Sequence, residues 1–404
     1  GQRKRSPDQR PVSSAGACLM TALAARSDAP SRILYLAPDL SDPAVARRRS
    51  MLIAGGAQVD LAGFVRGDAR LPPSEWCAEV LGRTRDAALG QRALKVLLAL
   101  LQPWALRRRV AGPSVVIARN LEMLVLAWAG LHLSRSAARL CYEVLDVHKV
   151  MLGQGLKARA LRWIEGFLMK RVDLLVLSSP AFDRAYFTPL QPSRVPRLIL
   201  ENKLLVLEDG APAPEPPPQG PPWRVGWFGM LRCSRSLELL QRLASRRPGL
   251  VEVDIRGRPS PAVFGSDFTS AVAKAPGLTF HGAYSASELA AAYRSVHFVW
   301  AIDFYEAGQN SDWLLPNRLY EGSAHGRPLM AQREVETGHW LAAHGAGVLF
   351  ENLEDGLEEF FDSLRPEAYE RAADAVARIP RSALLADRRD CQALVAQLMG
   401  AARD

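Results

Sequence analysis

The sequence has no pair of cysteines at the spacing of a disulfide framework or of a zinc site. Its five cysteines are odd in number and widely separated: Cys18, Cys77, Cys141, Cys233 and Cys391. Disulfide-stapled domains carry even sets of cysteines, and zinc sites use closely spaced Cys or His ligands. A D-x-D pair and a metal-spaced His/Cys cluster are also missing. We therefore expect reduced thiols and no metal site.

Long apolar runs are absent as well. No run reaches the roughly 18 to 20 residues that cross a bilayer. The basic N-terminal stretch lacks the ordered charged, apolar and small regions of a signal peptide. These absences predict a cytoplasmic protein.

Acidic residues are the minority among charges. The chain has 51 Lys and Arg against 42 Asp and Glu, a formal net charge of +9 and a pI near 9.6. This surplus favours an anionic partner, which can be nucleic acid, a nucleotide or the inner face of a membrane. Single-strand binders interleave aromatic and basic residues. That pattern is missing here, so no nucleic acid is expected.

The sequence does contain a repeated pattern, or rhythm, in which predicted strands, loops and helices alternate in each of two halves. With 404 residues, 48% of them hydrophobic, it is long enough for two cores. The rhythm predicts two Rossmann-like, doubly wound parallel-sheet domains, at 31–209 and 223–380, joined by a proline-rich linker at 210–222. Residues 1–30 are expected to form a flexible tail. A helix is expected within 381–404.

Polar residues follow the first predicted strand, Ile33 to Ala37. Asp39 and Asp42 lie in the next loop, and the basic run around Arg48 lies in the helix after it. Doubly wound domains bind ligands at the carboxyl ends of their strands. We therefore count these three residues as candidates for ligand binding. The alternative is an aspartate N-cap followed by a solvated basic turn.

Three titratable residues follow a later strand of the same half. Glu143, Asp146 and His148 lie at or beyond the carboxyl end of the strand that starts at Arg139. A carboxylate or imidazole there can accept the proton of an attacking hydroxyl. The alternative is a carboxylate that caps the helix starting near Lys149.

The second half opens with a strand that we expect to end at Gly229. Glycine lets a phosphate approach the backbone, Arg232 and Arg235 supply cations, and the helix predicted from Ser236 adds its dipole. A glycine followed by two arginines is a weak motif by itself.

The stretch 303–331 contains a polar loop and a short predicted helix, which Gly326 and Pro328 are expected to end. Pro316 suits the first turn of a helix because it has no amide hydrogen to leave unpaired. Arg318 and Glu321, three residues apart near that start, are placed to hold a phosphate and a ribose hydroxyl. The alternative is an ordinary surface ion pair.

The segment 91–110 combines a leucine run with Trp104 and the triplet Arg107 to Arg109. This composition fits an interfacial helix whose cations reach anionic headgroups, giving peripheral attachment to a membrane. The competing interpretation is a core helix with a basic C-terminal end.

Residues 316–328 match a signature, P-x-[KR]-x-x-E-x-x-A-x-G-x-P. It resembles that of GT-B glycosyltransferases, particularly bacterial exopolysaccharide (succinoglycan-type) transferases of the family with a Glu-x7-Glu pair. The resemblance implies that Glu321 is the second, ribose-binding glutamate, with Asn317 and Arg318 beside it in the donor site. The first glutamate would fall at Trp313, so half of the pair is absent.

Two shorter matches extend the resemblance. Tyr142-x-x-x-Asp146-x-His148 is similar to a stretch of the same transferases, which implies that Asp146 is the base or acceptor-facing group, with His148 its main rival. The Gly-x-x-Arg pattern puts Arg232 in the donor-pyrophosphate loop. The loop after the first strand would face the acceptor, and the C-terminal helix would cross back onto the N-terminal domain.

The resemblance implies a nucleotide-sugar-dependent transferase acting on a lipid-linked or polysaccharide acceptor. The nucleotide sugar, such as a UDP- or GDP-sugar, is the co-substrate, and no other cofactor is expected. No metal is required if Arg232 and Arg318 neutralise the leaving diphosphate. Two alternatives stay open: a non-enzymatic nucleotide- or nucleic-acid-binding protein, and a same-fold nucleotide-sugar epimerase.

Overall fold

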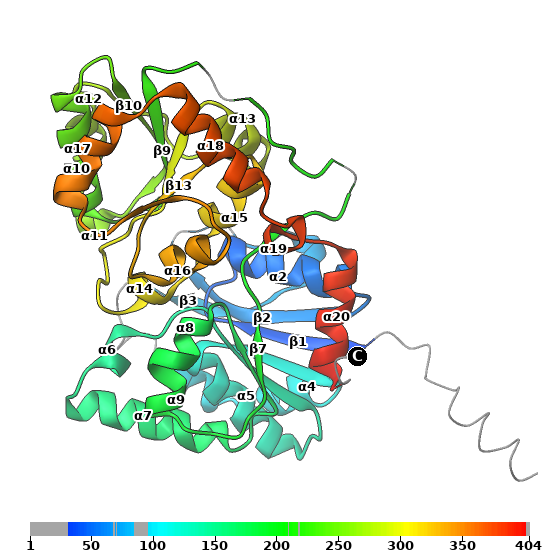
Figure 1. Cartoon of the computed structure of the whole chain (residues 1–404). Coiled ribbons are helices and arrows are strands. Elements are labelled where there is room, and N and C mark those ends of the chain that lie inside the picture. Colours follow the sequence, from blue (N-terminus) through cyan, green and yellow to red (C-terminus); the bar gives the residue numbers. More distant parts are fainter. Residues whose placement is uncertain are drawn as a thin grey trace, which may run out of the picture.

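The computed structural model describes residues 31–67, 69, 71–84, 96–208, 210–216 and 219–400. The expected N-terminal tail and residues 91–95 of the leucine-arginine segment lie outside these ranges. The described chain forms two lobes, each with a parallel sheet and helices packed on it (Figure 1). This confirms the predicted pair of doubly wound α/β domains.

The N-terminal sheet has seven parallel strands in the order β3-β2-β1-β4-β5-β6-β7. The order reverses direction between β1 and β4, which makes that point the switch point where such sheets bind ligands. The strands are β1 (Arg32–Ala37), β2 (Gln58–Arg66), β3 (Glu79–Thr84), β4 (Val115–Arg119), β5 (Arg139–Val144), β6 (Leu174–Leu177) and β7 (Arg197–Ile199). The α-helices of the described part of this lobe are α2 (Pro43–Ala54), α4 (Pro103–Val110), α5 (Asn120–Ser134), α6 (Lys149–Leu152), α7 (Leu156–Met169), α8 (Pro180–Phe182) and α9 (Thr188–Leu190).

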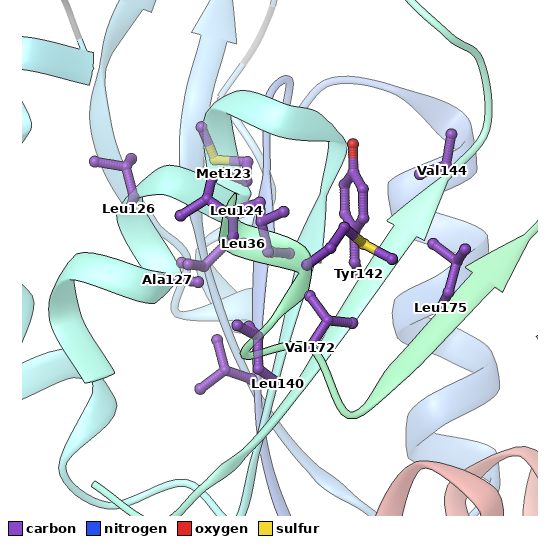
Figure 2. Packing of buried hydrophobic residues seen from close by; sticks show 14 of the residues in the cluster. Leu36, Met123, Leu124, Leu126, Ala127, Leu140, Tyr142, Val144, Val172 and Leu175 are labelled. Atoms are coloured by element: carbon purple, nitrogen blue, oxygen red, sulfur yellow. The ribbon is translucent and has the colours of Figure 1, made fainter. Parts of the chain in front are cut away.

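Both faces of this sheet are buried, which explains why its strands are continuous apolar runs. Side chains alternate between faces along a strand. In β1, Leu34 and Leu36 belong to the core under α5 and α7, whereas Ile33, Tyr35 and Ala37 belong to the core under α2. Figure 2 shows the first of these cores closely packed.

The C-terminal sheet repeats the arrangement with six parallel strands in the order β11-β10-β9-β12-β13-β14. Its switch point lies between β9 and β12. The strands are β9 (Trp223–Leu231), β10 (Val251–Pro259), β11 (Leu278–Phe280), β12 (Phe298–Trp300), β13 (Leu329–Gln332) and β14 (Val348–Phe350). The helices are α10 (Ser234–Arg246), α11 (Pro261–Phe264), α12 (Phe268–Ala273), α13 (Leu289–Arg294), α14 (Asn310–Trp313), α15 (Asn317–Ala324), α16 (Glu336–Ala343), α17 (Leu353–Ser363) and α18 (Pro366–Ala377).

The chain crosses between the lobes twice. After β7 it forms β8 (Leu204–Leu205) and enters the C-terminal lobe. After α18 it forms α19 (Arg381–Leu384) and then β15 (Leu385–Ala386), which pairs in parallel with β8. The final helix, α20 (Arg388–Met399), then packs beside α2 in the core of the N-terminal lobe (Figure 1).

The described part of the proline-rich segment lies against the C-terminal lobe. Arg327, which is fully buried, donates hydrogen bonds to the carbonyl oxygens of Tyr293 and Glu215 at 2.9 and 3.0 Å. Arg294 forms an ion pair with the Glu215 carboxylate, and Pro214 lies against Gly326. We call residues 210–216 the proline strap.

Several predicted boundaries differ from the structure. The strand expected to end at Gly229 continues to Leu231. Gly229 pairs with Gly257 of β10, and the two strands approach so closely there that a Cβ on Gly257 would lie 1.8 Å from the Gly229 carbonyl oxygen. Glycine here keeps two strands together and does not end one. The helix expected from Pro316 starts at Asn317, with Pro316 as its N-cap. Edge strand β3 was not predicted, since its half-exposed residues form no apolar run.

Candidate active site

A cavity of about 410 Å³ lies between the lobes, at the carboxyl ends of the strands on both sides. The N-terminal lobe contributes residues that follow β1, β4 and β5, and the C-terminal lobe contributes residues from β9, from the loop after β12 and from α15. A hollow of about 470 Å³ near α20 includes no residue that follows β1, β4, β9 or β12, so we place the site in the interlobe cavity. Its polar lining consists of Asp39, Asp42, Arg66, Arg119, Asn120, Asp146, Ser178, Asn202, Arg232, Tyr284, Asp303, Glu306, Asn310, Asn317, Arg318 and Glu321.

The C-terminal wall of the cavity holds two arginines close together. Arg232 follows β9 and pairs with Asp303 through two contacts to one carboxylate oxygen, at 3.1 and 3.3 Å. Arg318 comes from the first turn of α15, and its Nε is buried without a hydrogen-bond partner. Burial lowers the pKa of Arg318, and the charge of Arg232 lowers it further, whereas Asp303 opposes both. Arg318 therefore keeps one N–H group without a partner at this wall.

Gly229 lines the cavity beside these cations. Its φ of 109° is a conformation that side-chain-bearing residues rarely adopt, and no atom lies within 4 Å of where a Cβ would be. The open space allows a ligand to approach the backbone at this point.

Glu321 lies one turn after Arg318 on α15. It accepts a hydrogen bond from the Tyr293 hydroxyl at 2.9 Å. Burial raises the pKa of Glu321, against the opposing effects of that hydrogen bond and of the charges of Arg47 and Arg318. Its carboxylate thus reaches the cavity with one fixed partner.

Arg47 of α2 reaches across from the N-terminal lobe. It donates to the Asn317 side chain at 3.0 Å and to the Asn202 carbonyl oxygen at 3.0 Å. Asn317 was predicted as a donor ligand; its side-chain oxygen is held by this interlobe contact. The next residue, Arg48, turns the other way and is 6% exposed.

Arg48 binds Glu143 beneath the cavity. The Glu143 carboxylate receives Arg48 Nε at 2.6 Å, Arg119 Nε at 2.9 Å and the Tyr35 hydroxyl at 2.8 Å. Burial alone would raise the pKa of Glu143, but the charges of Arg119 and Arg48 with the Tyr35 hydrogen bond hold it at about 2. Neither Glu143 nor Arg48 lines the cavity, so the structure places both in the supporting framework, away from the positions that we predicted for contact with substrate.

Asp146, in contrast, opens into the cavity. Asn120, the first residue of α5, points its amide at the Asp146 carboxylate, 3.4 Å away. The side chain is accessible from the cavity, yet the enclosing protein removes much of its hydration. This desolvation raises the pKa of Asp146, and Glu306 across the cavity adds to the effect, while Arg232, His148 and Arg119 oppose it. His148, not a carboxylate, is the N-cap of α6.

The two predicted acceptor aspartates keep local partners. Asp39 accepts from the backbone and hydroxyl of Ser41 at 3.0 and 2.6 Å. Asp42 is the N-cap of α2, and its carboxylate lies 3.5 Å from Arg119. Both side chains also line the cavity. Each aspartate therefore has a local structural partner and faces the cavity at the same time.

Trp313 replaces the first glutamate of the family pair, and it docks the two lobes. Its ring packs edge-on against Phe182 and against the core of the N-terminal lobe, and its carbonyl oxygen accepts from the Ser179 hydroxyl at 2.6 Å. A position that would hold a carboxylate ligand is therefore an interlobe anchor in this chain.

Arg235 lies outside the cavity. It is paired with Glu354 of α17 at 3.0 Å and stacks on Phe304. Within the residues that the structure describes, no group of three His, Cys, Asp or Glu side chains could hold a metal ion.

The sequence analysis included Arg47 only as part of the basic run around Arg48, and it did not single out Arg119, Glu306 or Asn310. A signal existed for Arg119, a charged residue at the end of an apolar strand. Nothing in the spacing of Glu306 and Asn310 distinguishes them from surface loop residues, because Asn310 finds its backbone partner on the other lobe and Glu306 is held through Asn310.

No protein-family model matches the chain. Among solved structures, it resembles sucrose-phosphate synthase from Thermosynechococcus elongatus (TM-score 0.64, 14% identity, 91% of this chain and 98% of that one). It also resembles Anabaena HepE in complex with UDP (TM-score 0.59, 14% identity, 91% and 95%) and the lipopolysaccharide glycosyltransferase WaaG (TM-score 0.61, 13% identity, 91% and 100%). At these identities the likeness shows the fold.

Two facing Rossmann-like lobes with a cavity between their switch points define the class: the chain has the GT-B fold. The succinoglycan biosynthesis protein ExoL of Rhizobium meliloti (strain 1021) is 44% identical over 376 residues, 91% of this chain and 93% of that protein. The chain belongs to the family of that protein.

The buried Glu143 ion pairs generate a stability prediction. Because the pKa of Glu143 falls from 4.5 to about 2 on folding, the charged carboxylate stabilises the fold by roughly 3 kcal/mol at neutral pH. The stabilisation is complete above the unfolded pKa and is lost as pH falls through the folded one. Glu143→Gln should therefore lower the free energy of unfolding by roughly 3 kcal/mol or more at pH 7, with the difference from wild type shrinking between about pH 4.5 and 2.

Urea denaturation across this pH range measures the effect. Glu354→Gln, which removes an exposed carboxylate with two arginine partners, is the control and should change stability little. A Glu143→Gln protein as stable as wild type at pH 7 would contradict the framework role of this carboxylate.

Proposed function

We propose that this protein is a glycosyltransferase that moves a sugar from a nucleotide-sugar donor to a lipid-linked or polysaccharide acceptor, without a metal ion. The observation that carries the donor assignment is the pair of close guanidinium groups of Arg232 and Arg318 beside Gly229. An anion between them would relieve their repulsion and pair the free Arg318 Nε. Solved HepE structures contain UDP, and one contains UDP-glucose, which supports a nucleotide-sugar donor here.

The donor diphosphate is assigned to Arg232 and Arg318, and the ribose to Glu321. In this arrangement the two arginines stabilise the charge that grows on the leaving diphosphate, the task that a divalent cation performs in metal-dependent transferases. Glu321, one helical turn away, accepts hydrogen bonds from ribose hydroxyls. We therefore propose that no cofactor beyond the donor is needed.

Asp146 is our candidate for the base on the acceptor side. The acceptor hydroxyl oxygen forms a bond to the anomeric carbon, the bond from that carbon to the diphosphate oxygen breaks, and the hydroxyl proton passes to the Asp146 carboxylate. The raised pKa of Asp146 suits this task, since a base works best when its pKa approaches the working pH. Asp39 and Asp42 are then assigned to hydroxyl groups of the acceptor.

Glu321→Ala should weaken donor binding. The loss of a charge-assisted hydrogen bond costs about 1.5 to 3 kcal/mol, so the donor Kd should rise roughly 10- to 100-fold by calorimetry. Glu321→Gln keeps the shape of the side chain and an acceptor for the Tyr293 hydroxyl. It is therefore the second variant, which should bind the donor weakly without a folding defect. Glu359→Ala, an exposed carboxylate of the same lobe, is the control. Unchanged donor affinity in both Glu321 variants would rule out the ribose assignment.

Asp146→Asn should lower turnover and leave donor affinity unchanged. A general base contributes about 10²- to 10⁴-fold, and kcat should fall by a factor in that range. The measurement pairs product formation, with saturating donor and acceptor, with calorimetry of donor binding. Near-normal turnover would transfer the role to His148, since Glu143 is buried in ion pairs.

We further propose that the N-terminal lobe works at an anionic membrane surface on the cytoplasmic side. No helix in the described part of the chain is long and apolar enough to cross a bilayer. The helices that flank α5, namely the helical segment 96–100 with α4 on one side and α7 on the other, expose large apolar side chains. These are Leu97, Leu98, Leu101, Trp104, Leu156, Trp163 and Phe167, with Trp104 at 79% and Trp163 at 72% exposure.

Basic residues stand beside this apolar surface. Arg107 and Arg108 are exposed on α4, and Lys157 and Arg159 are exposed on α7. Apolar insertion combined with headgroup attraction is the usual basis of peripheral binding, at about 1 kcal/mol per cation. Figure 1 shows α5 and α7 at the end of the molecule remote from the C-terminal lobe, which leaves the cavity free.

Trp104→Ser combined with Trp163→Ser should reduce binding to phosphatidylglycerol-containing vesicles in a flotation assay. Arg107→Gln with Arg108→Gln should reduce it through the charge contribution, in a salt-dependent way. Ile53→Ser changes a similarly apolar exposed residue on α2 and is the control. Equal flotation of wild type and the double tryptophan variant would refute the surface.

A further inference from the structure

Asn310 joins the two lobes beside Asp146. Its side-chain oxygen accepts the Val147 backbone N–H at 3.0 Å, and its Nδ2 donates to the Val147 carbonyl oxygen at 2.7 Å. The asparagine is 4% exposed. A two-way amide contact of this kind fixes both the position and the orientation of the residue that follows Asp146.

The same Nδ2 also holds Glu306. It donates to the Glu306 carboxylate at 2.7 Å, and the Glu306 backbone N–H is bound by the Ser311 hydroxyl at 2.9 Å. Glu306 lines the cavity together with Asp146. One amide therefore binds a carboxylate of the C-terminal lobe and the backbone next to a carboxylate of the N-terminal lobe.

Charged groups face Asp146 from both lobes. Glu306 and Arg232 come from the C-terminal lobe, and His148 and Arg119 from its own lobe. Of these charges, Glu306 favours the protonated form of Asp146, while the other three favour the ionised form. The proton affinity of Asp146 is thus set partly by a residue that it meets only across the lobe contact.

We propose that Glu306 tunes Asp146 as a base, and that Asn310 is the positioning residue that holds Glu306 and the Asp146 segment together across the cavity. The proposal deepens the function above and rests on Asp146 being the proton acceptor. The charge of Glu306 reaches Asp146 only where the lobes meet, so this part of the tuning depends on the contact that Asn310 makes between them.

Glu306→Gln tests the charge directly. The amide keeps the shape and can still accept from Asn310, but the negative charge facing Asp146 is lost. The pKa of Asp146 should fall, and the acidic limb of the kcat/KM profile should move to lower pH, with donor Kd unchanged. Glu334→Gln removes an exposed carboxylate elsewhere in the same lobe and should leave both as in wild type.

Asn310→Ala tests the positioning role. It releases both Glu306 and the Val147 backbone, so kcat should fall roughly 10- to 100-fold, as misplacement of a catalytic group does. The acidic limb should move in the same direction as in Glu306→Gln. Because Asn310 acts through Glu306 on this limb, the double variant should show no further shift.

The Asp146 carboxyl pKa is measured by ¹³C NMR titration, with its resonance identified by its loss in Asp146→Asn. An unchanged Asp146 pKa and an unchanged acidic limb in Glu306→Gln would overturn the inference, even with Asp146→Asn inactive. Normal turnover of Asp146→Asn would instead overturn the assigned base. The two failures are distinct, since the titration does not depend on activity.

Discussion

The ion pairs of Glu143 are the interaction on which the N-terminal wall of the cavity depends. One carboxylate of β5 binds Arg48 of α2, Arg119 of β4 and Tyr35 of β1, so three neighbouring strands and a helix meet at one buried point. With Arg48 held inward, its neighbour Arg47 points toward Asn317 on the other lobe. Asp146, three residues beyond Glu143, emerges from the same anchored strand into the cavity.

Polar contacts and the ring of Trp313 are among the interactions that join the two lobes. Asn310 binds Val147, Ser179 binds the Trp313 carbonyl oxygen, and Tyr320 binds Glu201 at 3.1 Å. All three C-terminal members lie on or beside the segment that also carries Arg318 and Glu321. Two of the residues that we assign to the donor, Arg318 and Glu321, are therefore fixed by the same segment that fixes the lobes to each other, and the site is complete only in the joined arrangement.

The apolar strands, the loop positions and the donor helix were predictable, because buried parallel strands leave continuous apolar runs and the 316–328 signature is specific. The division of labour within a cluster was not. For Glu143 a signal existed that was not used. Glu143 and Cys141 lie two residues apart on β5, so their side chains point to the same face of the sheet, and Cys141 is in the core under α2. Strand alternation therefore predicts that Glu143 points inward. For Arg47 and Arg48, adjacent residues on one helix, only the surrounding lobe decides which faces the cavity. Contacts such as Asn310 with Val147 join residues 163 positions apart, beyond any local pattern.

The proline strap has a mechanical consequence. Arg327 binds the strap backbone and Arg294 binds the carboxylate of Glu215, while Arg381 of α19 donates to the carbonyl oxygen of Pro212. Residues 210–216 are therefore held by protein contacts and do not form a free linker between the lobes. The two passages of the chain between the lobes lie side by side where β8 pairs with β15. Both covalent connections between the lobes therefore meet at one place.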